Sequence, residues 1–164
     1  VIVLRFSGTP RDGHGHHQTS ALIAREAFAA AADPARFPEQ LALVQPWQTK
    51  RMMFNTFAFN REQEAEAAKL PNRLEIDTGE YSPLLGYSYG EIAGMSRSEH
   101  RSQGMGSSER KGSQRNILLN IAGDAATRDL FEGIDTSWKR VRGGAPIGEL
   151  LAEANRALDP MSPE

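Results

Sequence analysis

Three of the four histidines in this chain, His14, His16 and His17, fall within four consecutive residues directly after an apolar segment. Neutral imidazole is the commonest metal-ligating side chain in proteins. Gly13 and Gly15 give the backbone the freedom to bring imidazoles three residues apart toward one centre. A catalytic zinc takes about three protein ligands and keeps one position open for water. The loop is therefore a candidate metal site, and the alternative is a solvated polar loop whose histidines bind nothing.

The segments around this loop predict half of a β–α–β unit. The run from Val1 to Phe6 is largely apolar and β-branched, which predicts a strand covered on both faces. From about His17 the apolar residues follow helical spacing, and this helix should end at Asp33, because the residue before a proline disfavours the helical region. Open α/β sheets place their sites in loops at the carboxyl ends of strands. The histidines should therefore lie at such a site.

The rest of the chain continues the α/β pattern. Ser88 and Glu91 have the spacing of a capping box, which predicts a helix from Ser88 to about Gln103. Pro146 suits the first turn of a last helix. The remaining predicted elements are strands over 50–59, 74–77 and 117–121 and a short surface helix over 61–69. Together these elements predict an α/β fold with a Rossmann-like, mainly parallel sheet and flanking helices.

Composition limits the classes of function. The chain has 164 residues, of which 39% are hydrophobic, so it should form one domain or a piece of one. A formal net charge of −2 argues against a nucleic-acid partner. Because the chain has no cysteine, any transition metal must be held by His, Asp or Glu. Its apolar stretches are too short for a membrane span, which predicts a soluble protein. Export and oligomeric state are left open.

The histidine loop also carries a family resemblance. The residues from Gly13 to Ser20 resemble the second histidine motif, usually His-Pro-Asp-His, of the PIG-L/LmbE-like zinc-dependent N-acetylglucosaminyl deacetylases. The residues from Ser96 to Gln103 are similar to the His/Tyr-x-Ser/Thr-Gln segment on a late helix of that family. Residues 130–138 resemble a stretch found in its larger bacterial members. Together these segments cover most of the chain.

The resemblance implies roles for individual residues. His17 falls on the last histidine of the family motif and is implied to be a zinc ligand, whereas His14 falls on the first and is implied to stabilise the oxyanion during amide hydrolysis. Asp12 stands where some members have a tyrosine near the substrate, although an Asp before Gly also suits a turn. His100 and Gln103 are implied to contact the substrate. The alternative for these two residues is the solvated face of their helix.

The sequence departs from the family in two places. Gly15 and His16 replace the usual Pro-Asp of the motif, which makes the loop more flexible. The family's first motif, His-Pro-Asp-Asp, which supplies two more zinc ligands and the general base, has no counterpart here. Because Val1 also opens inside an apolar run without an initiator Met, we expect that the beginning has been lost; a naturally processed N-terminus is the alternative.

We therefore expect residues 1–164 to be the C-terminal part of a single PIG-L/LmbE-like deacetylase domain. The implied activity is Zn²⁺-dependent removal of an N-acetyl group from an amino sugar or glycoconjugate. Because only His17 has an implied ligand role, the isolated chain should bind zinc weakly and lack activity. The alternative is a non-catalytic carbohydrate-binding or interaction module on the same scaffold.

Overall fold

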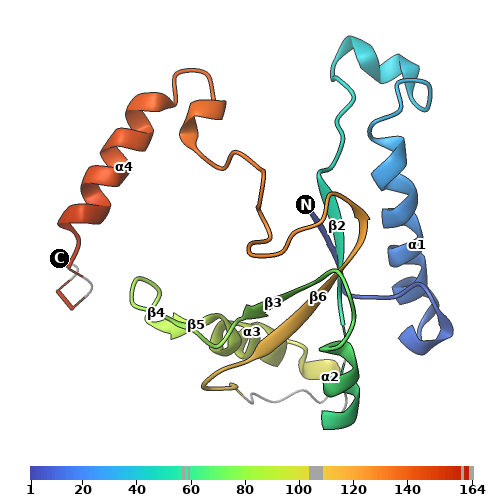
Figure 1. The fold of residues 1–164 in the computed structure, drawn as a ribbon, viewed down its shortest axis with the longest axis horizontal. Helices are drawn as coiled ribbons and strands as arrows, with labels where there is room; N and C mark the ends of the chain where they lie inside the picture. The colour runs from blue at the N-terminus through green and yellow to red at the C-terminus, as the bar shows by residue number, and fades with distance from the viewer. Residues whose placement is uncertain (57, 59, 104–108, 160, 163–164) are drawn as a thin grey trace. The chain divides into compact units, whose positions relative to one another are not determined.

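The computed structural model describes residues 1–56, 58, 60–103, 109–159 and 161–162. The protein is mixed α/β (Figure 1). Its chain divides into two compact units. The first unit comprises Val1–Glu75 and Ile117–Ile134, and the second comprises Ile76–Asn116 and Asp135–Glu164.

A four-stranded mixed sheet has the strand order β1-β2-β6-β3. Its strands are β1 (Ile2–Leu4), β2 (Arg51–Asn55), β3 (Arg73–Asp77) and β6 (Arg115–Gly123). The pair β1 and β2 is parallel, whereas β2 and β6 are antiparallel. The expectation of a mainly parallel sheet is therefore wrong for the described strands. The α/β class is confirmed.

Helix α1 (Gly15–Ala30) connects the parallel strands β1 and β2, so these three elements form a β–α–β unit. Ala21 is buried in one core cluster with Leu4 of β1 and Met52 of β2. Ala24 and Phe28 of α1 pack against the same cluster. The spacing of 21, 24 and 28 places these side chains on one helical face, which explains why the helix lies along the sheet.

Strand β1 differs from its prediction. It lies at the edge of the sheet. Val3 is 48% exposed, whereas Leu4 is only 6% exposed. The prediction of a strand buried on both faces was wrong, because a continuous apolar run does not distinguish a central strand from an edge strand.

A buried arginine anchors the chain that follows β6. Arg51 of β2 is 1% exposed, and its Nη1 donates to the carbonyl of Leu130 at 2.8 Å while its Nη2 donates to the carbonyl of Glu132. The Glu132 carboxylate in turn accepts from the backbone N–H groups of Thr127 and Arg128. These bonds fix residues 127–132 to β2 within the first unit.

The second unit contains the helix that the capping box predicts. Ser88 caps α3 (Tyr89–Ser98): its Oγ accepts from the backbone N–H of Glu91 at 3.2 Å, and its backbone N–H donates to the Glu91 carboxylate at 2.9 Å. The helix ends at Ser98, earlier than predicted, and a 3₁₀ turn covers Arg101–Gln103. Residues 104–108, predicted to follow the helix, lie outside the described residues.

The same unit holds a small hairpin and the last helix. The sequence did not predict the hairpin of β4 (Tyr81–Ser82) and β5 (Tyr87–Ser88). The last helix, α4 (Ala145–Ala157), has Pro146 in its first turn as predicted. It contacts the 3₁₀ turn Trp138–Arg140.

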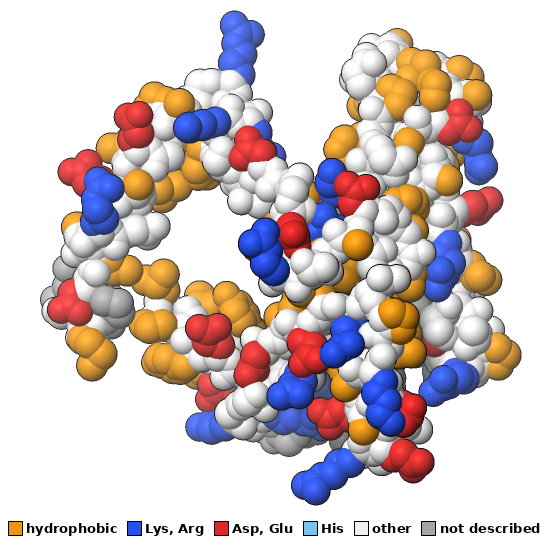
Figure 2. All heavy atoms as spheres, in the orientation of Figure 1, with side chains coloured by type: hydrophobic (Ala, Val, Ile, Leu, Met, Phe, Trp, Pro, Cys, Tyr) orange, Lys and Arg blue, Asp and Glu red, His pale blue; other side chains and the backbone are white. Residues whose placement is uncertain are grey.

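Apolar side chains gather on the surface of the segment that follows α1 (Figure 2, upper right). This segment includes the 3₁₀ turn Pro38–Ala42, and the most exposed apolar side chain in it is Leu43, at 89%. Trp47 is 64% exposed. Its backbone N–H donates to the carbonyl of Ala31. Among the described residues, no helix has the length and apolar character needed to cross a membrane.

Candidate functional site

The loop between β1 and α1 is organised by the Asp12 carboxylate. Asp12 ends the 3₁₀ turn Pro10–Asp12 and accepts from the backbone N–H groups of Ser7 at 2.9 Å, Gly8 at 2.7 Å and Thr9 at 3.2 Å, as well as from the Ser7 hydroxyl. Desolvation raises the pKa of Asp12, but these hydrogen bonds outweigh it and hold the pKa below its ordinary value. Asp12 is therefore a turn-forming anion, and a substrate contact from it stays a prediction.

His17 is fixed on two sides. Its ring stacks on Phe6, with 4.0 Å between the ring centroids and 8° between the planes. Its Nδ1 lies 3.1 Å from the backbone carbonyl oxygen of Asp12. Because a carbonyl oxygen can only accept, Nδ1 must carry the proton in this bond. In the neutral tautomer that carries its proton on Nδ1, Nε2 keeps its lone pair, and this is the form that binds a metal.

The imidazole of His14, the N-cap residue of α1, lies close to those of His16 and His17 in the first turn of this helix. The ring centroid of His14 is 5.3 Å from that of His17, and the centroid of His16 is 4.2 Å from that of His17. The predicted proximity of His14 and His17 is thus present at the start of α1. No group of three His, Asp or Glu side chains among the described residues is arranged to hold a metal ion. The loop alone therefore offers no complete catalytic zinc site.

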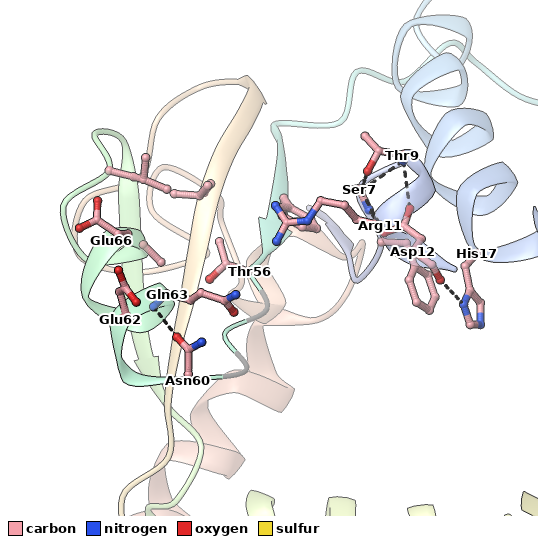
Figure 3. A pocket seen from close by; sticks show the side chains of 15 residues that line it. Ser7, Thr9, Arg11, Asp12, His17, Thr56, Asn60, Glu62, Gln63 and Glu66 are labelled. Carbon is pink, nitrogen blue, oxygen red and sulfur yellow. Dashed lines mark hydrogen bonds between the residues drawn. The ribbon is translucent and has the colours of Figure 1, made fainter. Parts of the chain in front are cut away.

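A cavity of about 900 Å³ lies beside the loop, within the first unit. One wall is the loop itself, and the other is formed by the end of β2 and by α2 (Arg61–Ala67), whose first turn is capped by Asn60 (Figure 3). Phe6, Phe54 and Leu119 give it an apolar lining between these walls. His17 and Asp12 line the cavity, whereas His14 is not among its lining residues. The cavity is the best candidate for a ligand site in the first unit.

The sequence did not single out several polar residues that line this cavity. Figure 3 shows the Arg11 side chain extending from the loop toward α2, and Glu62, Gln63 and Glu66 projecting from α2 on the other side. Arg11 directly precedes Asp12 in the sequence. This closeness to the histidines was the one feature that could have indicated Arg11 as a site residue. The α2 residues gave no local signal, because only the fold brings residues 60–70 beside residues 6–17.

The two predicted substrate residues on the late helix belong to the second unit. His100 and Gln103 are exposed there, directly after α3 and within or beside the 3₁₀ turn that follows it. The expectation that they approach His17 stays a prediction, as does the alternative that they belong to a solvated face.

Comparison with known proteins gives this chain no relatives: no protein-family model matches it, and no curated protein or solved structure is significantly similar to it.

Proposed function

We propose that this chain contributes part of the active site of a zinc-dependent hydrolase that removes the N-acetyl group from an amino sugar or glycoconjugate. The observation that carries the proposal is the hydrogen bond between Nδ1 of His17, a residue that lines the cavity, and the Asp12 carbonyl, because the neutral tautomer in this bond keeps the lone pair of Nε2 for a metal. Metal-ligating histidines commonly donate their second ring N–H to a carbonyl or carboxylate in this way. The resemblance of residues 13–20 to the deacetylase motif supports the same role.

The described residues can supply one zinc ligand but not a complete zinc site. His17 has suitable donor chemistry, but a catalytic zinc takes about three protein ligands, and the described residues hold no such group. In this proposal the other ligands and the general base come from protein segments beyond these 164 residues. Asp12 is a poor candidate for that base, because its carboxylate already accepts four hydrogen bonds from the loop.

The residues around the proposed zinc site would have separate roles. Bound zinc would supply Lewis acidity and a more acidic water molecule. Phe6 and the Asp12 carbonyl hold the His17 ring in one orientation, so that little reorganisation accompanies ligand binding. His14 lies next to His17 and would donate a hydrogen bond to the oxyanion that develops on the amide carbonyl. The proposal also treats the β1–α1–β2 unit as part of a Rossmann-like domain.

The test uses the protein at its full natural length, with zinc content and acetate release measured for the wild type and for three loop variants. His17→Ala should lower zinc occupancy. His14→Ala should leave zinc bound and reduce turnover by a factor of about 100, the usual cost of losing one oxyanion contact. His16→Gln is the matched control, because it removes a neighbouring imidazole that has no assigned role.

Two results would contradict the proposal. If His16→Gln lowered zinc occupancy as much as His17→Ala, the ligand assignment would be wrong. If the 164-residue chain alone released acetate at the full rate, the ligand count would be wrong. Sugar binding without zinc or acetate release would instead favour the non-catalytic carbohydrate-binding module.

A further inference from the structure

Two charged side chains of the cavity are available to a ligand. The side chains of Arg11 on the loop wall and of Glu62 on the α2 wall make no hydrogen bond or ion pair with any other residue in the described part of the chain. The other two charged lining residues are engaged: Asp12 accepts from the loop, and Glu66 pairs with Lys69 at 2.6 Å. The cavity therefore offers a ligand one guanidinium and one carboxylate.

Both groups stand on backbone that is held in place. Arg11 lies in a 3₁₀ turn closed by the bonds from Asp12 N to the Thr9 carbonyl and from Gly13 N to the Pro10 carbonyl. Glu62 lies in the first turn of α2, which Asn60 caps through a bond of 2.9 Å from Gln63 N. Figure 3 shows the two side chains on different walls of the cavity. A ligand that used both would therefore carry opposite charges on two separate groups.

We propose that this cavity holds the two charged products of amide hydrolysis, with the carboxylate on Arg11 and the ammonium on Glu62. This inference rests on the proposed function. In that reaction the water oxygen joins the acyl carbon, the C–N bond breaks, and both water protons end on the amine nitrogen. A neutral amide thus becomes one carboxylate and one ammonium, which match the two unengaged groups in sign.

The two charged groups should also make the cavity bind the charged products in preference to the uncharged substrate. Charge-assisted hydrogen bonds are stronger than neutral ones, and the arginine fork matches a carboxylate with two parallel bonds. The uncharged N-acyl substrate gains neither interaction. The cavity should therefore bind each product through one of the two groups and should bind the substrate without help from either.

The experiment is an NMR titration of the ¹⁵N-labelled 164-residue chain, with a chelator present so that acetate cannot bind a metal. The probes are acetate, glucosamine and N-acetylglucosamine. Arg11→Gln should weaken acetate binding by about tenfold, the usual worth of a hydrogen bond to a charged group, and leave glucosamine unaffected. Glu62→Gln should do the reverse. Neither variant should change N-acetylglucosamine binding.

Matched controls remove the same charges elsewhere. Arg25→Gln on α1 and Glu64→Gln on α2 alter exposed residues that do not line the cavity, and both should bind all three probes like the wild type. If Arg11→Gln disturbs the amide spectrum, Arg11→Lys serves in its place. This variant keeps the charge without the fork and should weaken acetate binding less than the loss of the charge does.

The outcomes separate this inference from the proposed function. Unchanged acetate binding in Arg11→Gln, equal losses in the control variants, or no saturable binding to the wild type would overturn the product assignment. Acetate release by the full-length protein without charge-specific probe binding would overturn the product assignment alone. If the full-length protein shows charge-specific binding but releases no acetate, the carboxylate and amine subsites would be supported and the proposed hydrolase function would be refuted.

Discussion

At the scale of single residues, Asp12 shapes the loop through both its side chain and its backbone. The carboxylate gathers the N–H groups of Ser7, Gly8 and Thr9, while the backbone carbonyl accepts from His17. The orientation of the proposed zinc ligand therefore depends on the turn that Asp12 stabilises.

Asp12→Asn should lower the melting temperature at pH 7, because the amide brings an N–H₂ group toward backbone N–H donors. The pKa of Asp12 is lower in the folded protein than in the unfolded chain, so its stabilisation is present above the unfolded pKa and is lost as pH falls through the folded pKa. The difference between wild type and variant should therefore shrink in acid. Thermal unfolding at pH 7 and at about pH 3 measures this, with the exposed Glu39→Gln as control. A difference that stays constant with pH would refute this account of the loop.

At the scale of elements, the cap of α3 combines a buried serine and a glutamate. Ser88 is 3% exposed and makes reciprocal bonds with Glu91. Ser88→Ala should reduce the free energy of unfolding by about 1 kcal/mol, the typical cost of losing an N-cap. Urea unfolding measures the change, and Ser96→Ala, on the exposed surface of the same helix, should have little effect. An equal loss in both variants would contradict the assigned role of the cap, because alanine favours the helix more than serine does.

Local and long-range interactions differ in how far the sequence predicts the elements that depend on them. Helix starts depend on local chemistry, so Ser88 with Glu91 and Pro146 indicated α3 and α4 correctly. The direction of strand pairing depends on residues far apart in the chain, and an apolar run does not encode it. The antiparallel placement of β6 beside β2 and the edge position of β1 were missed for this reason.

At the scale of the whole molecule, acidic side chains stabilise loops and caps in both units. Among the described residues, the pKa values of six carboxylates lie below their ordinary values, chiefly because each accepts hydrogen bonds; these residues are Asp12, Asp77, Glu91, Asp124, Glu132 and Asp135. For Asp77 the largest cause is the Ser113 hydroxyl, and for Asp124 it is Lys50. Unfolding therefore takes up protons in acid.

The protein should consequently lose stability steeply below about pH 4 and change little between about pH 6 and pH 8. Each folded pKa is depressed, so each contribution is present above the unfolded pKa and disappears as pH falls through the folded value. Melting temperatures measured across this range give the profile. Stability that rose on acidification would contradict the assigned carboxylate bonds.

Only part of the candidate site could be predicted from the sequence. The histidine loop was identifiable because its residues are neighbours in the chain. The opposite wall of the cavity could not be identified, because Glu62 and its neighbours on α2 reach the loop only through the packing of the first unit. Arg11 lies in the loop, but nothing in its spacing indicated that its side chain would line a cavity.

The most direct test of the proposed zinc ligand is ¹⁵N NMR of the His17 imidazole nitrogens at about pH 8.5, where free imidazole is neutral. In the metal-free chain we expect a proton on Nδ1, bonded to the Asp12 carbonyl, and a bare Nε2. Adding zinc to the full-length protein should then shift the Nε2 resonance while Nδ1 keeps its proton. A proton on Nε2 in the metal-free chain, or a zinc-induced shift confined to Nδ1, would contradict the account.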